Sequence, residues 1–441
     1  MQRAASSERR DARVVLAWGL TLPGTPAGVV ELADTPALGA GVARREGSNP
    51  SARTRDASGV PDLPPPLSGV RVVDLSTVVA GPGCARYLAD FGATVIKVER
   101  PDGGDSTRRM GFADPADPDG TSLFWKLVNR GKRCVVLDLK DDHDLARFLA
   151  LAATADVLVE NLRPGGLERL GAGPDVLLAA NPRLVITRIT GFGQDGPYRR
   201  RPGFATIAEA MSGFAAINGE PDGGPLLPPI ALTDEVTALA AAFATLAALR
   251  SGVGQIVDVN LLETLLQLMG PLPAAYAATG YLQPRLGSGI PYSVPRGTWQ
   301  ASDGIWIAVS TSAESVARRV LDLVGLGGDV ELTTFEGRVA HRDRVDACLA
   351  EWIGARTSAE VLAAFEQAEA AAAPVYDMAG VASDPHLAAR GALVELDGVV
   401  QQGLVARLSA TPGRLTYGGR GLGADQDVLD ADDPWAAASD G

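Results

Sequence analysis

From Leu67 onward, short runs of β-branched residues alternate with helix-like segments, and this alternation limits the possible folds more than any other feature of the chain. Helix-like segments such as residues 144–155 (DLARFLALAATA) separate the runs. Strands that alternate with helices indicate a parallel α/β sheet with right-handed crossovers, whose ligands bind in the loops after the strands. The strand-like runs are residues 70–76, 94–100, 133–140, 156–161 and 183–190.

Composition narrows the classes of function. The chain has 441 residues, enough for two or three domains, and a net charge of −13 that argues against nucleic-acid binding. The few cysteines and histidines are scattered, so we expect reduced structural thiols and no metal site. These residues are Cys84, Cys134, Cys348, His143, His341 and His386.

The most apolar stretch runs from Val236 to Leu249 and is flanked by Asp234, Glu235 and Arg250. A membrane-spanning helix needs about 20 apolar residues, so this stretch predicts a buried core helix instead. We therefore expect a cytoplasmic protein with no membrane association.

Residues 1–66 differ from the rest, being rich in Arg, Ser, Ala, Gly and Pro without a sustained period. We expect a disordered or mis-annotated extension. The segment EGSNPSART (46–54) can be encoded by a tRNA T-arm sequence, which suggests a reading frame that runs through an upstream tRNA gene. Peptides of the native protein from before about residue 60 would contradict this hypothesis.

The remaining chain divides by composition. Residues 67–270 form the first part of a large α/β domain, and the Gly/Pro-rich residues 271–304 suggest a linker or an active-site loop. Residues 305–380 predict a smaller α/β domain and residues 381–430 return to extended structure, whereas residues 431–441 suggest a disordered tail.

Asp234 and Glu235 stand directly before the apolar run of residues 236–249. Position alone favours helix capping, which stabilises a helix by roughly 1 kcal/mol, and Thr233 could supply the same cap. A helix N-terminus also favours a carboxylate that must stay ionised, so a chemical role for Asp234 uses the same geometry.

Several ordered stretches resemble the family III CoA-transferases, the group that contains formyl-CoA and carnitine CoA-transferases. The resemblance covers roughly residues 67–429. The stretches are VVDLSTVVAGPGCARYLADFGATVIKVERPDGGD, NRGKRCVVLDLK, VENLRPGGLERLG, NPRLVITRITGFGQDGPY, AEAMSGFAAINGEPDGGP, GVGQIVDVNLLE and SDPHLAARGALVEL.

The resemblance implies a Rossmann-like large domain formed from both ends of the chain, a small domain, and two ring-like subunits interlocked as a homodimer. It implies transfer of CoA from an acyl-CoA thioester to a free carboxylic acid, without a permanently bound cofactor. The family's nucleophile is an aspartate at the start of the helix after the GEPDGGP segment, which here is Asp234. The carboxylate attacks the thioester to give a mixed anhydride and then an aspartyl-CoA thioester.

The resemblance also implies CoA contacts after successive strands, where Arg and Lys would meet the phosphates. The matching positions are Val79, Ala80, Arg100, Leu137, Lys140, Asn161, Leu162, Arg163 and Arg169. The basic run Arg199–Arg201 either steers the anionic ligand or is a solvated loop. The segment LGSGIP (286–291) departs from the family pattern and either supplies oxyanion donors or is a plain linker turn.

Two alternatives stay open. Related racemases use a His-Asp pair where this chain has Phe204 and Ala205, neither of which exchanges a proton, so a 2-methylacyl-CoA racemase is the less favoured one. A non-catalytic CoA-binding paralogue is the other, because Ala205, the GSG loop and LGADQDVL near the C-terminus all depart from the transferase pattern.

Overall fold

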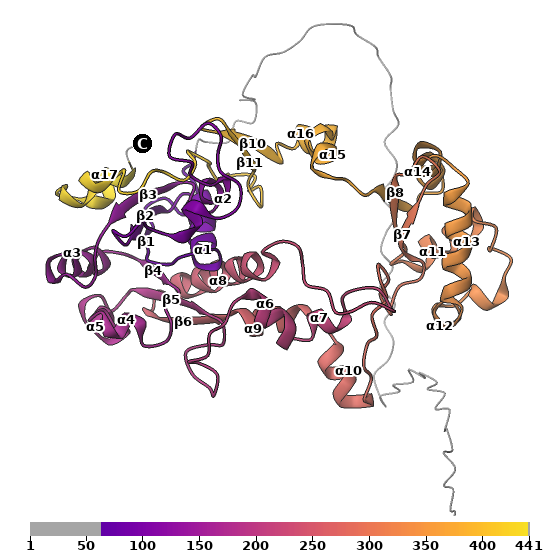
Figure 1. The fold of residues 1–441 in the computed structure, drawn as a ribbon, viewed down its shortest axis with the longest axis horizontal. Helices are drawn as coiled ribbons and strands as arrows, with labels where there is room; N and C mark the ends of the chain where they lie inside the picture. Colours follow the sequence, from indigo (N-terminus) through magenta and orange to yellow (C-terminus); the bar gives the residue numbers. More distant parts are fainter. Residues whose placement is uncertain (1–62, 440–441) are drawn as a thin grey trace, which may run out of the picture. The chain divides into compact units, whose positions relative to one another are not determined.

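The computed structural model describes residues 63–439, and its central element is a six-stranded parallel sheet (Figure 1). The proposed N-terminal extension lies almost wholly outside the described residues. The sheet order is β3-β2-β1-β4-β5-β6, so the order reverses between β1 and β4. The strands are β1 (Arg71–Asp74), β2 (Thr94–Glu99), β3 (Lys132–Val136), β4 (Val157–Glu160), β5 (Val185–Thr190) and β6 (Gln255–Asn260). The predicted α/β class and all five predicted strand-like runs are confirmed.

Helices cover both faces of the sheet because alternate strand residues point to opposite sides. Val73 and Leu158 pack against α3, α5 and the C-terminal segment, whereas Val72 and Val157 pack against α1 and α8. The α-helices between β1 and β6 are α1 (Ala80–Asp90), α2 (Leu123–Val128), α3 (Asp142–Ala153), α4 (Gly166–Arg169), α5 (Pro174–Ala180), α6 (Ala205–Met211), α7 (Phe214–Ile217) and α8 (Leu232–Ser251).

The chain after β6 forms a separate hydrophobic core, and its C-terminal segment then packs on the parallel sheet again. Helices α9 (Leu261–Leu268) and α10 (Leu272–Thr279) lead to an antiparallel sheet of β7 (Arg296–Gln300), β8 (Trp306–Ser310) and β9 (Ala371–Pro374). Its helices are α11 (Glu314–Leu323), α12 (Phe335–Ala340), α13 (Arg342–Gly354) and α14 (Ser358–Gln367). Then come α15 (Met378–Ser383), α16 (Pro385–Ala389), the hairpin β10 (Leu393–Leu396) and β11 (Val399–Gln402), and α17 (Pro434–Ser439). Helix α10 and strand β7 lie within the expected linker 271–304, so that stretch is only partly irregular.

The C-terminal segment packs back on the parallel sheet. Asp425 accepts a hydrogen bond from the backbone N–H of Cys134, and the side-chain amide of Gln426 pairs with the backbone of Val136. In Figure 1 this yellow segment lies beside the indigo and purple strands. The expectation of a disordered tail from residue 431 is wrong for residues 434–439, because Trp435 is buried and donates a hydrogen bond to Thr154.

Helix α8 differs from the expected buried core helix. Among the described residues it alone is long and apolar enough to cross a membrane, and 39% of its apolar window is buried. Its small residues pack on α1 so closely that a Cβ at Gly83 would lie 2.9 Å from the Ala238 side chain. Phe243 on its outer side is 75% exposed. The helix is therefore a core element on one side only.

Buried charges hold the loop that follows β1. Lys132 lies 2.8 Å from the carboxylate of Asp74, and Lys97 lies 3.5 Å from Asp74 and 3.4 Å from Asp105. All four side chains are fully buried. Burial alone would raise the pKa of Asp74, but the two ammonium groups lower it to about 2.

Replacement of Asp74 by alanine should lower the free energy of unfolding by about 3–5 kcal/mol, because it leaves two buried ammonium groups short of a counter-charge. Asp102→Ala, at an exposed carboxylate, is the control and should change it by less than about 0.5 kcal/mol. Since the pKa of Asp74 is lowered, its contribution is present above about pH 4 and is lost as the pH falls toward 2. Denaturant titration measures each value, and a loss below about 1 kcal/mol for Asp74→Ala would contradict the argument.

Candidate active site

Asp234 lies in the first turn of α8, as the third residue of the helix. The residue before the helix, Ala231, offers no capping side chain. Thr233 does not cap either, since it is the second helical residue and its hydroxyl donates to Glu209 at 2.8 Å. The expectation that Thr233 could cap the helix is therefore wrong, and capping does not account for Asp234.

The two neighbouring carboxylates have different surroundings. Glu235 accepts hydrogen bonds from Arg86 at 3.1 Å and from the hydroxyl of Tyr87 at 3.0 Å, both on α1. The side chain of Asp234 makes no hydrogen bond or ion pair with any other residue between 63 and 439. Burial first, and then the carboxylates of Glu209 and Glu235, raise the pKa of Asp234 to about 6. Asp234 is therefore mostly ionised at neutral pH and forms no ion pair within residues 63–439.

Asp234 faces a cavity of about 230 Å³ at the carboxyl ends of the parallel strands. Residues 77–80 follow β1, residues 161–164 follow β4, residues 189–192 end β5 and follow it, and Leu261 follows β6. The cavity thus lies at the reversal of strand order, where doubly wound sheets bind their ligands.

Asn161, which follows β4, is hydrogen-bonded to the loop after β1 on the other side of the strand-order reversal. Its side-chain oxygen accepts from the backbone N–H of Thr77 at 2.8 Å, and its amide nitrogen donates to the carbonyl of Thr77 at 2.6 Å. Gly81 lets the start of α1 lie close against this loop, because a Cβ there would lie 2.3 Å from the side chain of Ser76. The amide of Asn161 is used mainly to position the loop after β1.

A second cavity of about 520 Å³ adjoins the first and shares Thr77 and Leu162 with it. Its walls are the loops after β1, β2 and β3. Arg100 and Lys140 line this cavity and are both exposed to solvent. Its volume falls within the range of ordinary small-molecule sites, which is about 300–1,000 Å³.

The structure brings together eight of the nine residues predicted to contact CoA. Arg169 lines neither cavity, and its guanidinium lies near Gly165. The first cavity is lined by Val79, Ala80, Asn161, Leu162 and Arg163, and the second by Arg100, Leu137, Lys140 and again Leu162.

Sequence reasoning missed Glu209, which is 4% exposed and reaches toward the start of α8 through Thr233. The available signal was an acidic residue on the otherwise uncharged helix α6. Phe204 lines the Asp234 cavity, and no histidine lines it within the described part of the chain. This arrangement offers no partner for the acid/base pair that a racemase needs.

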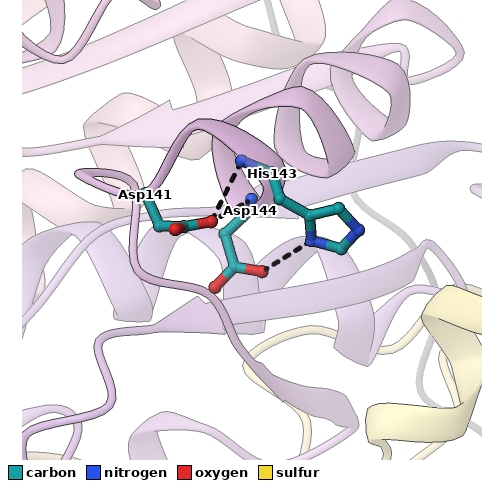
Figure 2. A group of neighbouring side chains, drawn as sticks. All are labelled: Asp141, His143 and Asp144. Carbon is teal, nitrogen blue, oxygen red and sulfur yellow. Dashed lines mark hydrogen bonds and ion pairs between the residues drawn. The ribbon is translucent and has the colours of Figure 1, made fainter.

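The thiols and one acidic cluster have ordinary structural explanations. Burial raises the pKa values of Cys84 and Cys134 to about 12, so neither thiol is ionised at neutral pH. Asp141, His143 and Asp144 have side-chain ligand atoms within 4.8 Å of one another (Figure 2). Asp141 caps α3 by accepting from the backbone N–H groups of the other two, and this cap accounts for the cluster.

Comparison with known proteins identifies the class. The family described as CoA-transferase family III matches residues 67–426, so the chain belongs to CoA-transferase family III. The succinyl-CoA–L-malate CoA-transferase alpha subunit of Chloroflexus aurantiacus is 39% identical over 383 residues, covering 82% of this chain and 88% of that protein. The succinate–glutarate CoA-transferase of Agrobacterium fabrum is 36% identical, covering 81% and 92%. The crystal structure of a CaiB/BaiF family protein from Brucella suis superposes with a TM-score of 0.75 at 31% identity, covering 84% of this chain and all of that one.

Replacement of Glu209 by glutamine should lower the pKa of Asp234, because it removes a neighbouring negative charge and keeps an acceptor for Thr233. The titration midpoint of Asp234 should therefore move below its parental position near pH 6. The carboxyl ¹³C chemical shift of Asp234, followed by NMR between pH 4 and pH 8, measures the change. Glu263→Gln, at an exposed carboxylate on α9, serves as the control, and an unmoved midpoint in Glu209→Gln would contradict the expected coupling.

Proposed function

We propose that this family III CoA-transferase moves CoA from an acyl-CoA thioester to a free carboxylic acid through covalent intermediates on Asp234. The observation that carries the proposal is an ionised carboxylate that forms no ion pair within residues 63–439 and lines a cavity at the strand-order reversal. The relatives are named for succinyl-CoA, malate, succinate and glutarate, which supports short dicarboxylic acids as the substrates of this chain.

The proposed sequence of bonds needs no external acid or base. A carboxylate oxygen of Asp234 attacks the thioester carbon, the carbon–sulfur bond breaks, and CoA leaves as the thiolate. The thiolate attacks the side-chain carbonyl carbon of Asp234, which releases the donor acid as a carboxylate and leaves an aspartyl-CoA thioester. The acceptor carboxylate then repeats the two steps in reverse, and splitting the exchange in this way lowers each barrier.

The residues around Asp234 suit these steps. A pKa near 6 keeps the nucleophile ionised at neutral pH while making it more basic than an ordinary aspartate. Helix α1 begins at the same cavity, and the backbone N–H groups of Ala80 and Gly81 have no partner within residues 63–439. We propose these two groups as oxyanion donors, which act strongly where water is excluded.

The two glycines of the GSG loop, by contrast, already use their backbone N–H groups within the chain. The N–H of Gly287 donates to the carbonyl of Gly219 at 3.0 Å, and the N–H of Gly289 donates to Leu286 at 2.8 Å. The loop lines neither of the two cavities at the strand ends. The arrangement supports the turn interpretation of residues 286–291 within one subunit.

Incubation with succinyl-CoA, rapid denaturation and intact-mass measurement should show the parent protein heavier by CoA less one water. Asp234→Ala should show no such adduct, because it lacks the nucleophile. Glu235→Gln, one residue away, is the matched control and should keep the adduct, since Glu235 faces Arg86. Absence of any adduct on the parent despite measurable CoA binding would instead support the non-catalytic paralogue.

We also propose that a second copy covers the outer side of α8 and the helices after it, as the family resemblance implies. No residue of α10 is buried, and Leu239 and Phe243 of α8 are exposed. An apolar surface of this kind on a folded chain marks an interaction site. The homodimer, its interlocked form and the cytoplasmic location remain predictions.

Light scattering coupled to gel filtration should give the mass of two chains for the parent protein. Phe243→Asp should reduce the dimer fraction by at least about tenfold, because it places a charge in an apolar contact. Phe112→Asp, at a side chain 83% exposed on another part of the surface, should leave the dimer intact. A parent protein with the mass of one chain would contradict the proposal.

A further inference from the structure

We propose that Arg199 and Arg201 bind the distal carboxylate of a dicarboxylic substrate while Asp234 attacks its thioester end. The inference rests on the proposed function, because it takes Asp234 as the nucleophile. It assigns the recognition of the acid to the loop of residues 191–203, between β5 and α6.

The first observation is the charge of the Asp234 cavity. Its ionisable lining residues are one carboxylate, Asp234, and three guanidinium groups, Arg163, Arg199 and Arg201. The whole chain carries a net charge of −13, so this local excess of positive charge does not follow from composition. A cavity with such a lining attracts an anion in addition to the thioester that Asp234 attacks.

The second observation is that these two arginines lack acidic partners within residues 63–439. Arg199 makes only a 3.5 Å contact with the carbonyl of Gly196, and Arg201 lies over the ring of Tyr198 at 3.8 Å. By contrast, Arg108 and Arg130 each bind a carboxylate through two nitrogens. The forked donors of Arg199 and Arg201 are thus available to a ligand carboxylate, for which guanidinium geometry is well matched.

The third observation is that packing contacts hold the loop of residues 191–203 at its two ends and at Tyr198. A Cβ at Gly191 would lie 2.7 Å from the backbone of Gly203, so the two ends of the loop touch. Tyr198, which Arg201 covers, packs edge-on against Phe192 with ring centroids 5.9 Å apart, and Phe192 lines the cavity. The stack of Phe192, Tyr198 and Arg201 holds the guanidinium at the wall of the Asp234 cavity before substrate binds.

The two cavities place Arg199 and Arg201 apart from Arg100 and Lys140, while five of the predicted CoA contacts share the Asp234 cavity with them. Arg199 and Arg201 line only the Asp234 cavity, whereas Arg100 and Lys140 line only the adjoining one. The thioester carbon must reach Asp234, so the acyl chain occupies the first cavity. A volume of about 230 Å³ suits a short acyl chain, and in the proposal the far end of that chain lies at the arginines on the cavity wall.

The test compares succinyl-CoA with butyryl-CoA, which has the same chain length and a methyl group in place of the carboxylate. Formation of the Asp234 adduct is measured in single turnovers without an acceptor acid. Arg201→Gln and Arg199→Gln should each lower the second-order rate constant of adduct formation with succinyl-CoA by about 10- to 100-fold, as expected for a hydrogen bond to a charged group. The same variants should leave butyryl-CoA within about threefold, which also shows that they fold.

Arg200→Gln is the matched control, because Arg200 lies between the two arginines but lines neither cavity. It should leave both donors unchanged. Equal losses with both donors would overturn the proposal and assign the arginines to the CoA phosphates. Unchanged kinetics with both donors would overturn it as well.

A binding measurement keeps the inference separate from the proposed function. Calorimetry with free succinate and CoA reports on the arginines even where the parent forms no adduct, an outcome that would refute covalent transfer by Asp234. Loss of succinate binding in Arg201→Gln supports the inference. Succinate affinity equal to that of the parent overturns it.

Discussion

The site depends on a group of buried charges at the carboxyl end of β1. Lys97 bridges Asp74 and Asp105 and donates to the carbonyl of Ser76, and Asp105 accepts from the backbone N–H of Val78. These bonds hold Val78 at a φ of 71°, which a β-branched residue rarely adopts. The loop so held lines both cavities. Buried charge therefore holds part of the walls of both cavities in place, including a residue with a strained backbone.

The sequence predicts the sheet well because its signal is local. Runs such as residues 94–100 and 183–190 are apolar and β-branched over a length that only a buried strand uses, and the structure confirms them. The prediction of a disordered tail at residues 431–441 fails at residues 434–439, because their order comes from Trp435, whose partner Thr154 lies far away in sequence. Long-range contacts of this kind leave no periodic pattern.

The site was predictable only in part, for the same reason. Asp234 could be proposed as the nucleophile only through the family motif, because its position in the sequence alone favours helix capping. The N-cap position of α8 is Ala231, and the hydroxyl of Thr233 goes to Glu209 across the helix packing. No spacing rule relates Glu209 to Asp234, since α6 and α8 meet only through the fold. The cationic wall formed by Arg199 and Arg201 also depends on two glycines that bring the loop ends together.

The adjacent residues Asp234 and Glu235 on α8 point into different surroundings. Successive side chains on a helix point about 100° apart, so Glu235 faces Arg86 on α1 while Asp234 faces the cavity. Glu235 is paired with α1, and this pairing stabilises the packing of α8 on α1. Burial and the neighbouring carboxylates of Glu209 and Glu235 raise the pKa of Asp234 to about 6. A cation bound directly to Asp234 would lower both its basicity and its nucleophilicity. The positive groups of this cavity therefore serve best at the far end of the substrate, where a second carboxylate can use them.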